Sequence, residues 1–259
     1  MTKTNILIIV FTKNLIAFLF IAFLSINASH ATLMLRITDT SVAGAPIVVT
    51  ATDQIATGGA NTAPDNSAGI LGLLSTSFST PNFFLTASSG VSKPLPPNTN
   101  KQASLFLREL AVSSANGGTL TIEISDNDFT LDGDPNGIFS AGITGRLGTN
   151  PLNTVEANYY YNTSNINFDT AGATIINSDF FSGSGGFDGN YRPVAITGTD
   201  QPFSITQVLT IHLEPNFQIM SFESRLHAVP EPGTLFLVGL GLCALVFAAR
   251  HSKQQKLFT

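Results

Sequence analysis

Hydrophobic and polar residues alternate with a period of two along much of the chain between residues 32 and 213. Six runs show this pattern, and they are rich in β-branched or aromatic residues and bounded by Gly, Pro, Asn and Asp. They cover residues 32–38, 46–52, 104–112, 118–125, 155–162 and 203–213. A period of two places successive side chains on opposite faces of a strand. The pattern therefore predicts an all-β protein, a single antiparallel β-sandwich of jelly-roll-like type with half-exposed strands.

Long connections between these runs are rich in Gly, Pro, Ser and Asn. Residues 56–69, 88–100 and 180–193 are therefore predicted to be surface loops. The polar middle of the chain, about 195 residues long, can bury one core without dividing into two domains.

The N-terminus has the features of a secretory signal peptide. Lys3 and Lys13 precede an apolar run at residues 15–26, and Ser29 and Ala31 provide small residues at the positions that signal peptidase requires. We expect cleavage after Ala31. An uncleaved N-terminal anchor is the alternative, because residues 6–11 add a second apolar patch.

A second apolar run, residues 234–249, lies near the C-terminus and predicts one transmembrane helix. At ~1.5 Å per residue it is about 24 Å long, slightly shorter than a ~30 Å hydrocarbon core. The basic residues Arg250, Lys253 and Lys256 follow it and are expected to stay in the cytoplasm, which places the preceding domain outside the cytoplasm.

The tripeptide Pro230, Glu231 and Pro232 comes just before this helix. Its prolines prevent the helix from extending backward and leave a rigid extended segment that a processing enzyme could recognise. A proline-containing linker before an ordinary tail anchor is the alternative reading.

The order of P-E-P, short apolar helix and basic tail resembles the PEP-CTERM sorting signal. The resemblance implies processing by an exosortase, a membrane cysteine transpeptidase of Gram-negative bacteria that also make extracellular polysaccharide. The tail departs from the family in lacking adjacent arginines, since it reads Arg250, His251, Ser252, Lys253. The start of the domain, with Leu33, Leu35 and Ile37, also resembles exported domains of such proteins, which end with a strand that runs into the tag.

These features predict three regions. Residues 1–31 form a signal peptide, residues 32–228 a β-rich exported domain, and residues 229–259 a sorting signal. We expect export through the inner membrane of a Gram-negative bacterium, transient anchoring in the membrane, and then a location at the cell surface or in an extracellular, exopolysaccharide-containing biofilm matrix.

Charge and cysteine content narrow the possible functions further. Residues 32–229 contain 16 acidic and 7 basic residues, a net charge of −9. This excess of negative charge argues against nucleic-acid binding, which requires cationic contacts. The single cysteine, Cys243, lies in the C-terminal apolar run, so the exported domain has no disulfide and no cysteine ligand or nucleophile.

One acidic turn is a candidate calcium site. Asp132, Asp134 and Asn136 match the first half of a calcium loop, with Gly137 at the turn, and Asp126 or Asp128 could add ligands. The twelfth position is Ile143 instead of the bidentate Glu of an EF-hand. A solvated acidic turn is the alternative, and no other cofactor is predicted.

The sequence predicts no enzyme. The exported domain has two histidines, His212 and His227, and neither lies in a recognisable nucleophile motif. Glu123 paired with Asp126, or Asp126 paired with Asp128, could serve glycoside cleavage in principle, but such acids are more often surface groups.

We therefore expect a non-enzymatic surface or matrix protein. A carbohydrate-binding module, calcium-dependent if the acidic turn binds the ion, is the alternative. The aromatic residues available for stacking on sugars are Tyr159, Tyr160, Tyr161, Phe180, Phe181 and Tyr191, and the chain contains no Trp. Alternation along a strand must direct at least one residue of the tyrosine triplet into the core.

Overall fold

A computed structural model describes residues 32–92, 103–131, 136–189 and 191–229. The predicted signal peptide and the predicted transmembrane run at residues 234–249 lie outside the described residues. Within the part of the chain that is described, no helix is long and apolar enough to cross a membrane.

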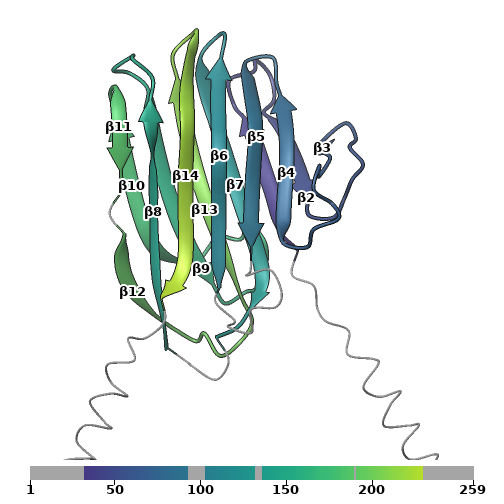
Figure 1. Cartoon of the computed structure of the whole chain (residues 1–259), viewed down its shortest axis with the longest axis vertical. Helices are drawn as coiled ribbons and strands as arrows, with labels where there is room; N and C mark the ends of the chain where they lie inside the picture. Colours follow the sequence, from purple (N-terminus) through teal and green to yellow (C-terminus); the bar gives the residue numbers. More distant parts are fainter. Residues whose placement is uncertain (1–31, 93–102, 132–135, 190, 230–259) are drawn as a thin grey trace, which may run out of the picture. The chain divides into compact units, whose positions relative to one another are not determined.

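The described residues form strands arranged in two sheets that face each other (Figure 1). Sheet A has the strand order β10-β9-β13-β7-β1-β2-β3, and sheet B has the order β11-β8-β14-β6-β5-β4, with β12 also paired to β8. Neighbouring strands are antiparallel except β2 and β3. The structure thus confirms the all-β, sandwich-like fold that the alternation predicts.

The strands have these bounds: β1 Met34–Asp39, β2 Ile47–Thr52, β3 Thr62–Ala63, β4 Leu73–Ser79, β5 Phe83–Ser92, β6 Ser104–Ser114, β7 Gly118–Phe129, β8 Asn136–Leu147, β9 Thr154–Asn162, β10 Thr174–Ser182, β11 Gly185–Asp188, β12 Arg192–Thr197, β13 Phe203–Leu213 and β14 Phe217–Val229.

Alternating side chains on both sheets build one hydrophobic core. In β9, Tyr159 and Tyr161 are buried between the sheets, whereas Tyr160 lies on the outer face of sheet A. This is the division of the tyrosine triplet that the period of two requires. Two of the three tyrosines are therefore part of the core and do not contribute to the surface.

The last two strands of the domain are central in both sheets. β13 lies between β9 and β7 in sheet A, and β14 lies between β8 and β6 in sheet B. Neither sheet is continuous until these strands are in place. β14 extends to Val229, the last described residue, so both sheets are already continuous at that point of the chain.

A fully buried polar network joins the two sheets. Tyr159 of β9 and Gln207 of β13 are cross-strand neighbours in sheet A. The Tyr159 hydroxyl lies 3.0 Å from Ser224 Oγ of β14, and Ser224 Oγ donates to Gln207 Oε1 at 2.8 Å. Gln207 Nε2 in turn donates to the carbonyl of Leu105 in β6. Burial raises the pKa of the Tyr159 hydroxyl far above its usual value and outweighs the opposite effect of the bond to Ser224, so the hydroxyl stays protonated.

All three predicted loops contain strand residues, and segment 56–69 includes the short strand β3. Residues 88–92 belong to β5, and the segment 180–193 includes the end of β10, all of β11 and the start of β12. Strand β8 also escaped prediction, because its glycines interrupt the alternation. A Cβ at Gly145 would lie 2.5 Å from the Phe222 Cβ and 2.7 Å from the Phe187 ring, so this strand needs glycine for close packing.

We predict that Ser224→Ala destabilises the domain by about 1–3 kcal/mol, because it leaves the Tyr159 hydroxyl and Gln207 Oε1 buried without their partner. Ser113→Ala is the matched control, since the Ser113 hydroxyl makes only an exposed 3.4 Å contact with the carbonyl of Phe84. It should change the free energy of unfolding by less than about 0.5 kcal/mol. Urea denaturation followed by circular dichroism measures both values, and equal stability of the two variants would contradict the role of the network.

Candidate functional site

The described acidic residues among those singled out in the sequence do not converge on one place. Asp132 and Asp134 lie outside the described residues, and Asn136 begins β8 with an exposed side chain. Asp126 is buried and accepts a hydrogen bond from Ser92 Oγ of sheet B. Among the described residues, no group of three or more His, Cys, Asp or Glu side chains is placed to hold a metal ion.

Asp128 is held by Asn165, which lies in the loop after β9. It has a left-handed backbone conformation with φ of 58°, and its carboxylate accepts from Asn165 Nδ2 at 2.6 Å. Its own amide donates to Asn165 Oδ1 at 2.7 Å. Asp126 and Asp128 therefore serve different contacts, and they do not form the carboxylate pair considered for glycoside cleavage.

Glu123 and Asp126 lie on opposite faces of β7. Glu123 points outward from sheet A and accepts from Arg36 Nη2 at 2.7 Å, whereas Asp126 points into the sandwich. The structure thus corrects the idea that these two acids could act together on one substrate.

The two histidines lie on the outer faces of different sheets. In sheet A, His212 Nδ1 is 3.1 Å from Thr119 Oγ1, and His212 Nε2 is 3.7 Å from Glu214. In sheet B, His227 stacks on Phe106 with 6.4 Å between ring centroids. Burial lowers the pKa of His227, and the charge of Arg225 lowers it further, so His227 is neutral near pH 7.

The aromatic candidates are also dispersed. Phe180 is 63% exposed on the edge strand β10 of sheet A, and Phe181 stacks on Phe187 of β11 at 4.7 Å. Tyr191, which is 39% exposed, lies on the outer side of sheet B. Of the six predicted aromatics, Tyr191 has the surroundings best suited to bind a ligand.

Tyr191 lies over a strand position that has no side chain. A Cβ at Gly142 of β8 would approach three atoms of the Tyr191 ring to 3.1 Å, so glycine allows the ring to lie close to the backbone. The cross-strand neighbour of Gly142 is Arg225 of β14, whose own neighbour in β6 is Phe106. An aromatic ring, a guanidinium and a second aromatic ring therefore follow one another across the outer face of sheet B.

Ion pairs with Glu223 hold Arg108 and Arg225 on this outer face. Arg225 Nη2 lies 2.8 Å from Glu223 Oε1, and Arg108 Nε lies 3.3 Å from the same oxygen. The Arg108 guanidinium also lies over the Phe106 ring at 5.1 Å from its centroid. The bond to Glu223 raises the pKa of Arg225 above its ordinary value.

We call this surface the arginine–aromatic face; it comprises Phe106, Arg108, Tyr191, Glu223, Arg225 and His227. Side-chain exposure of 48% for Arg108 and 44% for Arg225 leaves both guanidinium groups accessible. Four of the five arginines among the described residues lie on strands of sheet B, in a domain whose net charge is negative. The sequence did not identify this face, because cross-strand neighbours are distant along the chain.

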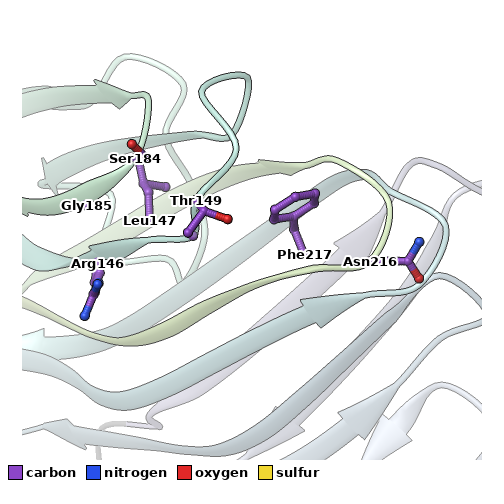
Figure 2. Close-up of a pocket in the computed structure, with 8 residues that line it drawn as sticks. Arg146, Leu147, Thr149, Ser184, Gly185, Asn216 and Phe217 are labelled. Atoms are coloured by element: carbon purple, nitrogen blue, oxygen red, sulfur yellow. The ribbon is translucent and has the colours of Figure 1, made fainter.

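A pocket of 480 Å³ lies at one end of the sandwich, where three turns meet (Figure 2). It is lined by Arg146, Leu147, Gly148, Thr149, Ser184, Gly185, Asn216 and Phe217. Its volume falls within the range of ~300–1,000 Å³ for small-molecule sites. Arg146 is exposed and lies two residues beyond Thr144, the cross-strand neighbour of Glu223. The pocket therefore adjoins the side of sheet B that carries the arginine–aromatic face.

The family model of the PEP-CTERM protein-sorting motif matches residues 228–253. The chain thus carries a PEP-CTERM sorting motif, which includes Pro230, Glu231 and Pro232 and begins as β14 ends. A PEP-CTERM motif marks a protein for export through the secretory pathway and for sorting to the cell surface, with an exosortase as the processing partner.

Three solved structures illustrate what the chain resembles at low similarity. TmCBM61 in complex with beta-1,4-galactotriose is 8% identical, with a TM-score of 0.26 and coverage of 56% of this chain and 86% of that chain. The K3 cleaved adhesin domain of Lys-gingipain from Porphyromonas gingivalis W83 is 12% identical, with a TM-score of 0.22 and coverage of 75% and 91%. The infectious bursal disease virus VP2 subviral particle is 14% identical, with a TM-score of 0.29 and coverage of 76% and 56%.

At these TM-scores the likenesses support no functional argument. No curated protein matches the chain.

Proposed function

We propose that this chain is a non-enzymatic surface protein whose β-sandwich is delivered outside the inner membrane of a Gram-negative bacterium and processed by an exosortase near Pro230–Pro232. Signal peptidase removes residues 1–31, and the run at residues 234–249 anchors the protein until processing. The observation that carries this proposal is the sorting motif matched at residues 228–253, which overlaps the end of β14, the last described strand.

The position of the sorting tripeptide after β14 has a simple consequence for processing. Cleavage within the tripeptide removes no described strand, so the hydrogen bonds of β14 to β6 and β8 remain intact. A cut even a few residues earlier would shorten a central strand of sheet B. The domain can therefore leave the membrane without unfolding.

The charged side chains on the outer faces support a binding role more than a hydrolytic one. Glu123 is paired with Arg36, and Glu223 is shared by Arg108 and Arg225. Each carboxylate is thus already engaged by one or two arginines, which is not the arrangement of a glycosidase acid that must face the bond it cleaves. These carboxylates therefore serve better as fixed hydrogen-bond acceptors.

The arginine–aromatic face favours a carbohydrate as the ligand. Sugar rings present apolar faces that stack on aromatic rings and hydroxyl groups that bond to guanidinium and carboxylate groups. Tyr191 over β8 and Phe106 on β6 are separated by two strand spacings, about 9.5 Å. Two rings at this separation suit an extended chain of sugars that runs across the β-strands, such as a segment of an exopolysaccharide.

We predict that protein purified from its native host begins at Thr32 and ends close to Pro230–Pro232. The reason is that small residues, Ser29 and Ala31, precede the first site, and two prolines flank Glu231 at the second, each next to an apolar run. Intact-mass spectrometry measures both ends. A Pro230→Ala, Pro232→Ala double variant should keep its tail, and a mature parent protein that still contains Cys243 would show that the tail is only an anchor.

We also predict that the parent protein binds exopolysaccharide of its own host and that Tyr191→Ala weakens this binding about 2- to 10-fold, which corresponds to an aromatic contact of about 0.5–1.5 kcal/mol. Tyr160→Ala is the matched control, because Tyr160 also lies on an outer face but in sheet A. Affinity electrophoresis in polysaccharide-containing gels compares the variants.

The polysaccharide should keep its original chain length after incubation with the parent protein. Equal losses of binding in Tyr191→Ala and Tyr160→Ala would show that the arginine–aromatic face is not the binding site. Shortened polysaccharide would contradict the non-enzymatic role.

A further inference from the structure

Two buried carboxylates lie next to each other beside the β2–β4 end of the sandwich. Asp53 directly follows β2, and Asp65 lies two residues beyond β3; they are 7% and 2% exposed. Between residues 32 and 92 the only Lys or Arg is Arg36, which is paired with Glu123. Within residues 32–92, neither acid is therefore paired with a basic side chain.

Backbone amides surround the Asp65 carboxylate. Its Oδ1 accepts from the amides of Ser67 at 2.8 Å and Ser75 at 3.0 Å, and its Oδ2 accepts from the amide of Gln54 at 3.0 Å. A carboxylate offers about four lone-pair positions, so Asp65 Oδ2 keeps one that is not used.

Asp53 is less well satisfied. Its Oδ2 accepts from the amide of Gly72 at 2.8 Å, whereas its Oδ1 is buried without a hydrogen-bond partner. Gly72 has φ of +76°, and a Cβ there would lie 2.4 Å from the carbonyl oxygen of Ser92, so only glycine can present this amide. The loop is therefore built closely around one oxygen of the carboxylate and leaves the other oxygen buried without a hydrogen-bond partner.

The electrostatics of this pair are unfavourable without a cation. Both carboxylates are buried, and the hydrogen bonds that they accept among the described residues come from backbone amides. Burying an unpaired ionised carboxylate is costly, and structures usually avoid it by pairing the group or by binding a metal ion. A hard divalent cation would satisfy both charges at once.

We infer that Asp53 and Asp65 bind one calcium ion, with Asp53 Oδ1 as a direct ligand and Asp65 Oδ2 as the second carboxylate ligand. Calcium accepts six to eight oxygen ligands in flexible geometry, so backbone carbonyls and water complete its coordination, whereas magnesium requires a near-ideal octahedron. This site is separate from the acidic turn at Asp132, Asp134 and Asn136, and it does not depend on the proposed function.

The test uses the full-length chain in detergent, stripped with EDTA and titrated with CaCl₂. Isothermal titration calorimetry should show one calcium ion per chain with Kd of about 10⁻⁴–10⁻³ M, as in extracellular calcium modules. Calcium should also raise the melting temperature, because it binds the folded state. MgCl₂ at the same concentration should have a smaller effect.

Asp53→Asn separates a metal site from a merely structural contact. It removes one charge but keeps the shape and an oxygen for the Gly72 amide, and its new NH₂ group occupies the place of the unpaired Oδ1. We expect this variant to melt at a higher temperature than the parent without calcium and to lose at least about tenfold in calcium affinity. Asp200→Asn, at an exposed position, should behave like the parent.

The Asp132→Asn, Asp134→Asn double variant distinguishes the two possible sites. Retention of calcium binding in this variant, together with its loss in Asp53→Asn, supports the inference. The inference is overturned if the parent shows no response to calcium, if Asp53→Asn keeps the parent affinity, or if Asp53→Asn is unfolded or less stable than the parent without calcium.

Discussion

The hydrogen bonds that join Tyr159, Ser224 and Gln207 between the two sheets are the constraint on which the rest of the domain depends. Every member of this network is fully buried, so an unmade bond would leave a polar group without water or protein as a partner. The bonds can form together only when β9 and β13 of sheet A face β14 and β6 of sheet B in one register. The network therefore selects a single packing of two sheets whose apolar side chains alone would tolerate several. This selection matters in a domain that has no disulfide to fix its strands.

That packing determines which side chains remain outside. With Tyr159 and Gln207 directed inward, the alternation of sheet A places Glu123, Tyr160 and His212 on its outer face, where Arg36 and Thr119 hold two of them. In sheet B the same alternation along the strands directs Leu105, Phe139 and Leu226 inward. Phe106 and Arg225 then face outward, next to Tyr191 over Gly142. The arginine–aromatic face is thus a consequence of the register that the buried bonds impose.

The central position of β13 and β14 also connects the fold to export. These strands come last in the domain, so neither sheet is complete until the chain has emerged as far as Val229. The sorting motif, matched at residues 228–253, overlaps the end of β14. Loss of the residues after Val229 would remove no described strand.

The sequence predicted those parts of the structure that depend on local alternation. The six predicted strands correspond to β1, β2, β6, β7, β9 and β13, and the division of the tyrosine triplet follows from the same period of two. Strand β8 could not be predicted, because Gly137, Gly142 and Gly145 replace the side chains that would reveal a strand, and close packing explains their presence only after the fold is known.

The chemistry depends on contacts between distant segments, and local patterns do not reveal these. Glu123 and Asp126 are close along the chain but lie on opposite faces of β7, whereas Asp53 and Asp65 are 12 positions apart and share one buried site. The calcium pattern at Asp132 and Asp134 was visible because it is local, and for the same reason it gave no sign of the second carboxylate pair.

Native-state hydrogen exchange is the most direct test of the claim that buried polar bonds unite the two sheets into one cooperative unit. The account predicts that amides of β13 in sheet A and of β14 in sheet B exchange most slowly, and that both exchange only by global unfolding with the same free energy. Ser224→Ala should lower both values equally. If the amides of one sheet exchange through a partial opening while those of the other sheet stay protected, the sheets are independent and the account is contradicted.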